Sequence, residues 1–341
     1  MPSLIVVHGD FEAHWPFVAD QIYLRWRDED ETALIRLPRG DQRRLGEVVA
    51  DASEVTRLVA LGLPVTLACT HAFSALREAA CLPAYGPSQL APECVEAWQR
   101  QGVILYQQRS EGFWGQSVAE FALALTLNGL RRIPQNYHEM LTSHEAWLRY
   151  GPSRNQGPGT WGSQFSDDLR FSHGTIAGKR VRIVGAGNIG SRYASFVHML
   201  GADVAVWDPY AAEPAFHRAG SRRAWHLDHL VRDAEIFAPM LPLKEDTRGL
   251  VTAAHIAALP KGCLVVLATR ALICDMQAIR QRVLADELSL AADVFDVEPL
   301  PLDDPLLGRH NVVHTPHLAG RTFDSNRQWA EDLISQFERR E

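Results

Sequence analysis

The chain has 341 residues, of which 46% are hydrophobic and 22% charged, and its formal net charge at pH 7 is −7. This length is sufficient for two globular domains, each with its own hydrophobic core. The acidic balance argues against a surface that binds nucleic acid or an anionic membrane, so we expect neither partner.

Signals for export, membrane insertion and metal binding are weak. The apolar run 4–7 has no basic residues before it and is too short for a secretory signal. The longest apolar stretch, 118–127, contains Glu120 and falls short of a membrane span. The five cysteines form no CxxC pair, and His226 and His229 have no partner cluster, so we expect neither a disulfide framework nor a metal site. These features favour a cytoplasmic protein.

The first third of the chain alternates between strand-like and helix-like segments, which predicts an α/β domain. The strand-like segments are residues 4–7, 33–37, 65–68 and 103–106. Residues 111–115 contain two glycines and lead into a helical run at 117–130. We expect the chain to pass between domains at 111–115, and we place a domain hinge there. Residues 150–159 are rich in glycine and proline and predict a loop. A final helix is expected at 321–339 and should pack back on the first domain.

The most informative motif is Gly-Ala-Gly-Asn-Ile-Gly at 185–190. It follows an alternating segment at 179–184 and opens a segment with helical spacing at 188–200, so it lies at a strand-to-helix turn. In that setting Gly185 permits the tight turn, Gly187 lets a pyrophosphate approach the backbone, and Gly190 lets helix and strand pack closely. The start of the helix then favours phosphate groups.

The next strand-like segment, 204–207, ends on Asp208. A carboxylate there can accept hydrogen bonds from the adenosine ribose and repels a 2′-phosphate, which favours NAD over NADP. Two alternatives remain open at this point. The hexapeptide could be a structural turn, and a methyltransferase also places a glycine-rich turn and an acid on a similar sheet.

Further strand-like segments at 236–241, 263–268, 288–292 and 312–314 predict a doubly wound sheet. Three side chains that follow them suit chemistry on an oxo acid: Arg270, Glu298 and His317. A guanidinium can bind a carboxylate through two hydrogen bonds, and a histidine can carry a proton near neutral pH. Taken singly, each has an ordinary interpretation as a surface arginine, a solvated acid or a packed histidine.

In order and spacing, residues 102–320 resemble the D-2-hydroxyacid dehydrogenase family, which includes phosphoglycerate dehydrogenases and glyoxylate or hydroxypyruvate reductases. The segments that carry the resemblance are Ser-Val-Ala-Glu at 117–120, the glycine turn with Asp208-Pro209, Leu-Pro-Leu at 241–243 with Thr-Arg-Gly-Leu at 247–250, Thr269-Arg270, Asp-Val-Phe at 293–295 with Glu298-Pro299, and Thr-Pro-His at 315–317. The resemblance implies an NAD-dependent enzyme that interconverts a 2-oxo acid and a D-2-hydroxy acid.

The resemblance also implies an α/β fold of two Rossmann-like domains. A doubly wound NAD-binding domain, residues 113–317, is inserted in a flavodoxin-like substrate domain, residues 1–112, which the C-terminal helix within 318–341 completes. The substrate domain is expected to close on the cofactor domain about the hinge. Because members of the family are usually homodimers joined through their cofactor domains, we expect a homodimer.

Carried over residue by residue, the resemblance implies that His317 is the general acid in reduction of the oxo acid and the base in the reverse direction. Glu298 hydrogen-bonds to His317 and favours its protonated form, while Arg270 binds the substrate carboxylate and polarises the carbonyl. Asp293 contacts the nicotinamide carboxamide. The other residues expected to line the cofactor, NADH rather than NADPH, are Gly185, Gly187, Asn188, Ile189, Gly190, Asp208, Pro209, Leu241, Pro242, Ala268, Thr269, Leu318, Ala319 and Gly320. The substrate loop is expected at Tyr85, Gly86 and Pro87.

Several positions depart from the family pattern. Leu267 and Ala271 stand where Asn and Gly are frequent, and an alanine would be strained if position 271 needs a positive φ. Met240 stands where many members have a histidine. Phe113-Trp114 replaces small residues near the cleft, and we interpret this pair as packing of the hinge rather than as a sign of a larger or more apolar substrate.

The departures keep an alternative function open: a corepressor-like protein that senses NAD(H) with little or no turnover. A formate or phosphite dehydrogenase fits less well, because those relatives oxidise a substrate that has no alcohol proton.

Overall fold

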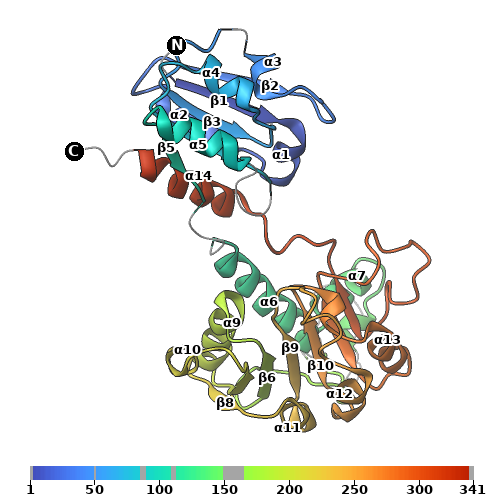
Figure 1. The fold of residues 1–341 in the computed structure, drawn as a ribbon. Coiled ribbons are helices and arrows are strands. Elements are labelled where there is room, and N and C mark those ends of the chain that lie inside the picture. The colour runs from blue at the N-terminus through green and yellow to red at the C-terminus, as the bar shows by residue number, and fades with distance from the viewer. Residues whose placement is uncertain (1–2, 50, 85–89, 109–112, 149–164, 338–341) are drawn as a thin grey trace. The chain divides into compact units, whose positions relative to one another are not determined.

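The computed structural model describes residues 3–49, 51–84, 90–108, 113–148 and 165–337. Contacts within the chain divide it into two units (Figure 1). The first unit comprises Met1–Phe113 and Arg321–Glu341, and the second comprises Trp114–Gly320. The chain therefore leaves its first unit, builds the second, and returns to complete the first.

The first unit contains a five-stranded parallel sheet with strand order β2-β1-β3-β4-β5, which is the order of flavodoxin-like folds. Its strands are β1 (Ser3–His8), β2 (Thr32–Leu37), β3 (Arg57–Leu61), β4 (Glu78–Leu82) and β5 (Ile104–Tyr106). Its helices are α1 (Gly9–His14), α2 (Val18–Trp26), α3 (Leu45–Val48), α4 (Leu67–Ala72), α5 (Pro92–Arg100) and the C-terminal α14 (Phe323–Phe337).

Helix α14 packs within the first unit, as expected for the end of the chain. The Asn326 side chain donates a hydrogen bond to the Pro16 carbonyl over 2.9 Å. The Phe337 ring lies 5.0 Å from the ring of Trp26 and 4.5 Å from that of Tyr106, centre to centre. These aromatic contacts fasten the last helix to α2 and to the edge strand of the first sheet.

One predicted strand of the first unit is wrong. Residues 65–68 are not a strand, because the true strand β3 ends at Leu61 and α4 begins at Leu67. Gly62 has a φ of +78° and Pro64 has no amide hydrogen, so the intervening residues leave the sheet. Strand β4, Glu-Ala-Ala-Cys-Leu, has no β-branched residue and was not predicted.

The second unit contains a seven-stranded parallel sheet with order β12-β11-β10-β9-β6-β7-β8. The strands are β6 (Arg180–Val184), β7 (Asp203–Trp207), β8 (Arg222–Ala224), β9 (Ile236–Pro239), β10 (Leu264–Leu267), β11 (Ser289–Ala292) and β12 (Val312–His314). The strand order reverses between β6 and β9, which is where a doubly wound sheet binds ligands at its carboxyl edge. The predicted fold class is confirmed.

Helices cover both faces of this sheet. They are α6 (Phe113–Arg131), α7 (Ile133–Met140), α8 (Glu145–Leu148), α9 (Asn188–Met199), α10 (Glu213–Arg218), α11 (Leu227–Leu230), α12 (Ala253–Ala258) and α13 (Met276–Leu284), with short 3₁₀ turns at Val231–Asp233 and Ala271–Ile273. Strand β10 shows why its sequence is apolar throughout. Leu264 and Val266 enter the core on one face, while Val265 and Leu267 enter the core on the other.

The expected crossing at 111–115 is helical from Phe113 onward, so the described part of the hinge region is not an open turn. The Phe113 ring packs edge-on against Trp15 at 5.6 Å, and Trp114 packs against the core of the second unit. A Cβ on Gly115 would lie 2.5 Å from the Asn188 side chain, so a larger residue there would require that side chain to move. The aromatic pair therefore serves packing. The loop predicted at 150–159 lies outside the described residues.

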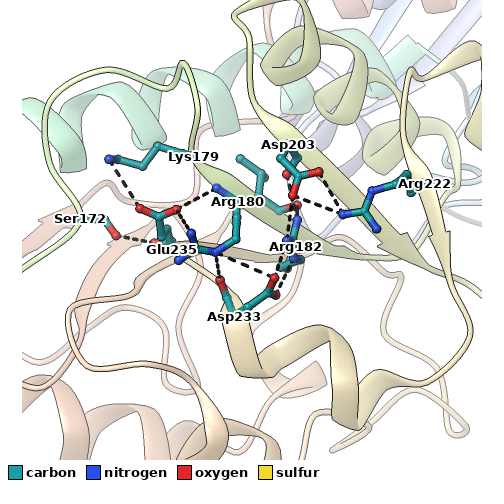
Figure 2. A network of polar contacts seen from close by, with 9 residues as sticks. Ser172, Lys179, Arg180, Arg182, Asp203, Arg222, Asp233 and Glu235 are labelled. Atoms are coloured by element: carbon teal, nitrogen blue, oxygen red, sulfur yellow. Dashed lines mark hydrogen bonds and ion pairs between the residues drawn. The ribbon is translucent and has the colours of Figure 1, made fainter.

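Figure 2 shows a network of charged side chains at the amino ends of β6, β7, β8 and β9. Arg182, with its side chain only 3% exposed, donates to both Asp233 oxygens over 2.7 and 2.6 Å and to Asp203 over 3.0 Å. The hydrogen bonds from Arg182 hold the pKa of Asp233 below its usual value. This network joins the strands at the edge opposite to the one where ligands bind in such sheets.

No helix within the described ranges is long and apolar enough to cross a membrane.

Candidate active site

The glycine turn after β6 has the geometry that its three glycines predict. Gly185 has a φ of +103°, which favours glycine, and a Cβ on Gly190 would lie 2.1 Å from the Gly185 carbonyl oxygen. Helix and turn can therefore approach only without a side chain at position 190. At Gly187, the residue that precedes α9, a Cβ would meet no atom within 4 Å. The backbone at Gly187 thus faces open space at the start of a helix.

Asp208 lies at the end of β7 and connects that strand to the glycine turn. Its Oδ2 accepts a hydrogen bond from the Ala186 amide over 2.8 Å, and its Oδ1 accepts from the amides of Tyr210 and Ala211 over 2.9 and 3.0 Å. An ionised carboxylate has about four lone-pair positions, so these three bonds leave capacity for another donor. The carboxylate is held at the carboxyl edge of the sheet, beside the turn.

The residues expected after β9 and β10 follow strands of the same sheet, and one of them contacts the glycine turn. The Leu241 side chain lies within 2.7 Å of the position a Cβ on Gly185 would take, so it packs directly against the glycine turn. Thr269 donates from its hydroxyl to the Pro239 carbonyl over 3.2 Å, and the Thr247 hydroxyl donates to the Pro242 carbonyl over 2.6 Å. These bonds fix the backbone that follows two neighbouring strands.

His317 lies in the segment after β12, and the buried carboxylate of Asp293 holds that segment. Asp293 follows β11 and is completely buried. Its Oδ1 accepts from the Thr315 hydroxyl over 2.6 Å and from the Leu318 amide over 2.9 Å, while its Oδ2 accepts from the Ala319 amide over 2.8 Å. The three donors lie on both sides of His317.

The backbone of His317 is in the left-handed region, with a φ of +56°. This conformation costs about 1–2 kcal/mol for a residue other than glycine. Hydrogen bonds to an ionised acceptor contribute about 1.5–3 kcal/mol each, so the bonds to Asp293 can offset that cost. A single side chain thereby fixes the direction in which the imidazole leaves the backbone.

The imidazole of His317 is paired with Glu298. The distance from His317 Nδ1 to Glu298 Oε2 is 2.7 Å, and the other carboxylate oxygen, Oε1, accepts from the Phe295 amide over 2.8 Å. The His317 side chain is 44% exposed and that of Glu298 is 35% exposed. Because Glu298 occupies Nδ1, Nε2 is the ring nitrogen through which His317 can exchange a proton with a ligand.

Arg270 follows β10. Strands β10, β11 and β12 are neighbours in the sheet, and Asp293 and His317 follow the other two. Arg270 is exposed, and its Nη1 donates to the Thr269 carbonyl over 2.7 Å. The Asp293 amide donates to the Leu267 carbonyl, and the Thr315 amide donates to the Ala292 carbonyl, so the segments after β10, β11 and β12 remain in register beyond the strands. The Arg270 guanidinium, the Asp293 carboxylate and the His317 imidazole thus all follow the carboxyl ends of neighbouring strands.

The three departures from the family pattern are accommodated without strain. Met240 is 3% exposed and packs near Gly190, and Leu267 is completely buried in the core on the opposite face of the sheet. Ala271 begins a 3₁₀ turn, and it is not among the non-glycine residues with positive φ. The condition under which Ala271 would be strained, a positive φ, is therefore not met.

The substrate loop expected at Tyr85, Gly86 and Pro87 lies outside the described residues. Among the residues that are described, no three His, Cys, Asp or Glu side chains form a group that could hold a metal ion.

Comparison with known proteins identifies the family of this chain. The model of the D-isomer specific 2-hydroxyacid dehydrogenase family, NAD binding domain, matches residues 123–319. D-3-phosphoglycerate dehydrogenase of Archaeoglobus fulgidus is 28% identical over 224 residues, which cover 64% of this chain and 38% of that protein. Glyoxylate/hydroxypyruvate reductase B of Klebsiella pneumoniae is 29% identical over 211 residues, or 62% of this chain and 60% of that protein.

Among solved structures, D-mandelate dehydrogenase of Rhodotorula graminis has a similar fold, with a TM-score of 0.65 at 18% identity over 99% of this chain and 94% of that one. The matched part spans 38–50% of the length of the first phosphoglycerate dehydrogenases that the chain resembles. The family match covers more than half of the chain. The protein therefore belongs to the D-isomer specific 2-hydroxyacid dehydrogenase family, and residues 123–319 match the NAD-binding domain of that family.

Proposed function

We propose that the protein is an NAD-dependent oxidoreductase that interconverts a 2-oxo acid and a D-2-hydroxy acid. The observation that carries this proposal is the His317–Glu298 pair, at 2.7 Å, on the same sheet edge as Arg270 and the glycine turn. A proton carrier, its orienting carboxylate and a cation for a carboxylate are the three groups that such a reaction needs from the protein.

The turn after β6 fits the dinucleotide. The open space at Gly187 and the amides at the start of α9 suit the pyrophosphate, and Asp208 is available at the end of the next strand for the adenosine ribose. Bound here, the nicotinamide supplies the hydride for reduction or accepts it in oxidation. Leu241, Pro242, Ala268 and Thr269 would line the cofactor, together with Asn188, Ile189, Gly190, Pro209, Ala319 and Gly320.

In reduction, Arg270 would bind the substrate carboxylate and polarise the neighbouring carbonyl. His317 would donate its proton from Nε2 to the carbonyl oxygen as that oxygen becomes an alcohol. Glu298 would hold Nδ1 throughout, stabilising the imidazolium before transfer and the ring orientation after it. The resemblance would also give Asp293 a contact with the nicotinamide carboxamide, although in this structure its side chain is completely buried and hydrogen-bonded to the His317 segment. In oxidation the same groups act in reverse.

No observation favours the corepressor-like alternative. Its support was the set of departures at Met240, Leu267 and Ala271, and these positions fill the core or adopt an ordinary conformation.

Replacing His317 by Gln and Arg270 by Ala should give separable defects. His317→Gln removes the proton donor, so we expect kcat to fall by about 100-fold or more while NADH binding is retained. Arg270→Ala removes the carboxylate partner, so we expect chiefly a raised KM for the oxo acid. Steady-state kinetics with NADH fluorescence titration measure both effects. Unchanged kinetics in either variant would remove that residue from the proposed mechanism.

A matched pair of glycine substitutions tests the cofactor site. Gly187→Ala puts a methyl group into open space, so the fold should be unchanged while NADH affinity falls by about tenfold, or about 1.4 kcal/mol. Gly190→Ala places a methyl against the Gly185 carbonyl and should destabilise the domain by about 1–3 kcal/mol. Chemical denaturation and NADH titration compare the two. Equal NADH affinity in wild type and Gly187→Ala would exclude a pyrophosphate at this turn.

We further propose a preference for NADH over NADPH, supported by the carboxylate of Asp208 beside the turn. Asp208→Ala should lower the ratio of kcat/KM for NADH to that for NADPH by about tenfold or more, because the charge that repels a 2′-phosphate is gone. Asp208→Asn is the companion variant, since it loses the charge but retains one oxygen, which can accept either from the Tyr210 and Ala211 amides or from the Ala186 amide. A ratio that stays constant in both variants would contradict the ribose assignment.

We propose a homodimer joined through the NAD-binding domains, as is usual in the resembling family. Support comes from large apolar side chains that are exposed on α7 and beyond it: Tyr137 is 61%, Leu141 63% and Trp147 54% exposed. Leu141→Lys should shift the sedimentation coefficient from dimer to monomer. Met199→Lys, on the exposed end of α9, is the control and should not. A monomeric wild-type protein at micromolar concentration would refute the proposal.

A further inference from the structure

The loop that carries Glu298 is fastened to helix α13 by one arginine. Arg280, on α13, donates to Asp296 from Nη2 over 2.8 Å and to Asp304 from Nη1 over 2.8 Å. Its Nε also lies 3.3 Å from both Asp296 oxygens. The guanidinium thus joins two carboxylates that lie on either side of Glu298 in the chain.

These contacts are well shielded from water. The side chain of Arg280 is 19% exposed, that of Asp296 26% and that of Asp304 only 8%. Asp304 also accepts from the Leu306 amide over 2.9 Å, so it is fixed to the backbone at the far end of the loop. Several charge-assisted bonds on partly buried groups hold a loop more firmly than one surface ion pair.

Within the described part of the chain, the hydrogen bond that Glu298 makes besides the one to its histidine partner is short-range. Glu298 Oε1 accepts from the Phe295 amide, three residues earlier, and Asp296 lies between those two residues. Any shift of the backbone at position 296 would therefore move both the Phe295 amide and Glu298. Without Arg280, the carboxylates of Asp296 and Asp304 would face one another uncompensated and would push this backbone apart.

We propose that Arg280 is a positioning residue for Glu298: by clamping Asp296 and Asp304 it places the carboxylate that holds Nδ1 of His317. The expected effect of Arg280 on turnover rests on the proposed function. Its expected effect on the Glu298–His317 hydrogen bond is independent of that function. Arg280 itself touches neither reacting group and acts through the loop.

The test compares Arg280→Met with Arg282→Met on the same helix. Arg282 is buried to a similar degree, at 15% exposed, but it binds Glu287 and the carbonyls of Ile256 and Leu259. Both variants lose one partly buried guanidinium, so both should lose stability. Only Arg280→Met should lower kcat, by about 10-fold to 100-fold, with the KM for NADH nearly unchanged. Arg280→Lys, which retains a cation, should restore part of kcat.

A second readout is independent of turnover. In histidine-labelled protein, the proton on His317 Nδ1 gives a low-field magnetic resonance signal, identified by its absence from His317→Gln. We expect this signal in the wild type and in Arg282→Met, and its loss or exchange broadening in Arg280→Met. Asp296→Asn, which is isosteric and removes the charge of the Arg280 partner that precedes Glu298, should weaken the signal in the same way if Arg280→Met fails to fold.

Retention of both kcat and the Nδ1 signal in Arg280→Met or Asp296→Asn would overturn the proposal. Equal loss of kcat in Arg280→Met and Arg282→Met would also overturn it, because the effect would then be one of stability. A protein that turns over no oxo acid but loses the Nδ1 signal only in Arg280→Met would refute the proposed function and uphold the positioning role.

Discussion

The candidate site depends on one buried carboxylate. Asp293 leaves the end of β11 and accepts hydrogen bonds from Thr315, Leu318 and Ala319, and those bonds hold His317 between them in a left-handed conformation. Burying a charge in this way is favourable only because three donors meet it. The same carboxylate follows β11 at the carboxyl edge of the sheet, so it connects the fold to the proposed proton carrier.

In the second unit, the charged groups that bind one another lie at the amino ends of the strands, and those of the candidate site lie at the carboxyl ends. At the amino ends, the Arg182 network joins β6, β7 and the start of β9 through charges that compensate one another (Figure 2). At the carboxyl ends, the charged groups are those of the candidate site: Asp208 beside the glycine turn, Arg270 after β10, and Glu298 with His317. Parallel strands make this separation possible, because all their carboxyl ends lie on one edge. Arg280 likewise pairs with two carboxylates, those of Asp296 and Asp304, in the loop beyond the sheet.

Sequence patterns predicted what is locally determined. The roles of Gly185 and Gly190 followed from a strand-to-helix turn. They agree with the φ of +103° at Gly185 and with the 2.1 Å that would separate a Cβ on Gly190 from the Gly185 carbonyl oxygen. Sequence patterns did not predict features that depend on contacts between residues distant in the chain. Residues 65–68 look strand-like, yet Gly62 and Pro64 end the strand earlier, while the alanine-rich β4 is stabilised by pairing with β3 and β5. Asp293 accepts hydrogen bonds from residues 22 to 26 positions away, and Arg280 donates to Asp304. No pattern of neighbouring residues indicates either contact.

The most direct test of the central claim is NADH oxidation by the purified protein with a panel of 2-oxo acids from glyoxylate to phenylpyruvate, followed by determination of product chirality. The account predicts that at least one acid is reduced at a rate well above background, with the D-2-hydroxy acid as the product whenever the product is chiral. Tight NADH binding with no oxidation by any acid, or an L-hydroxy acid as product, would contradict it.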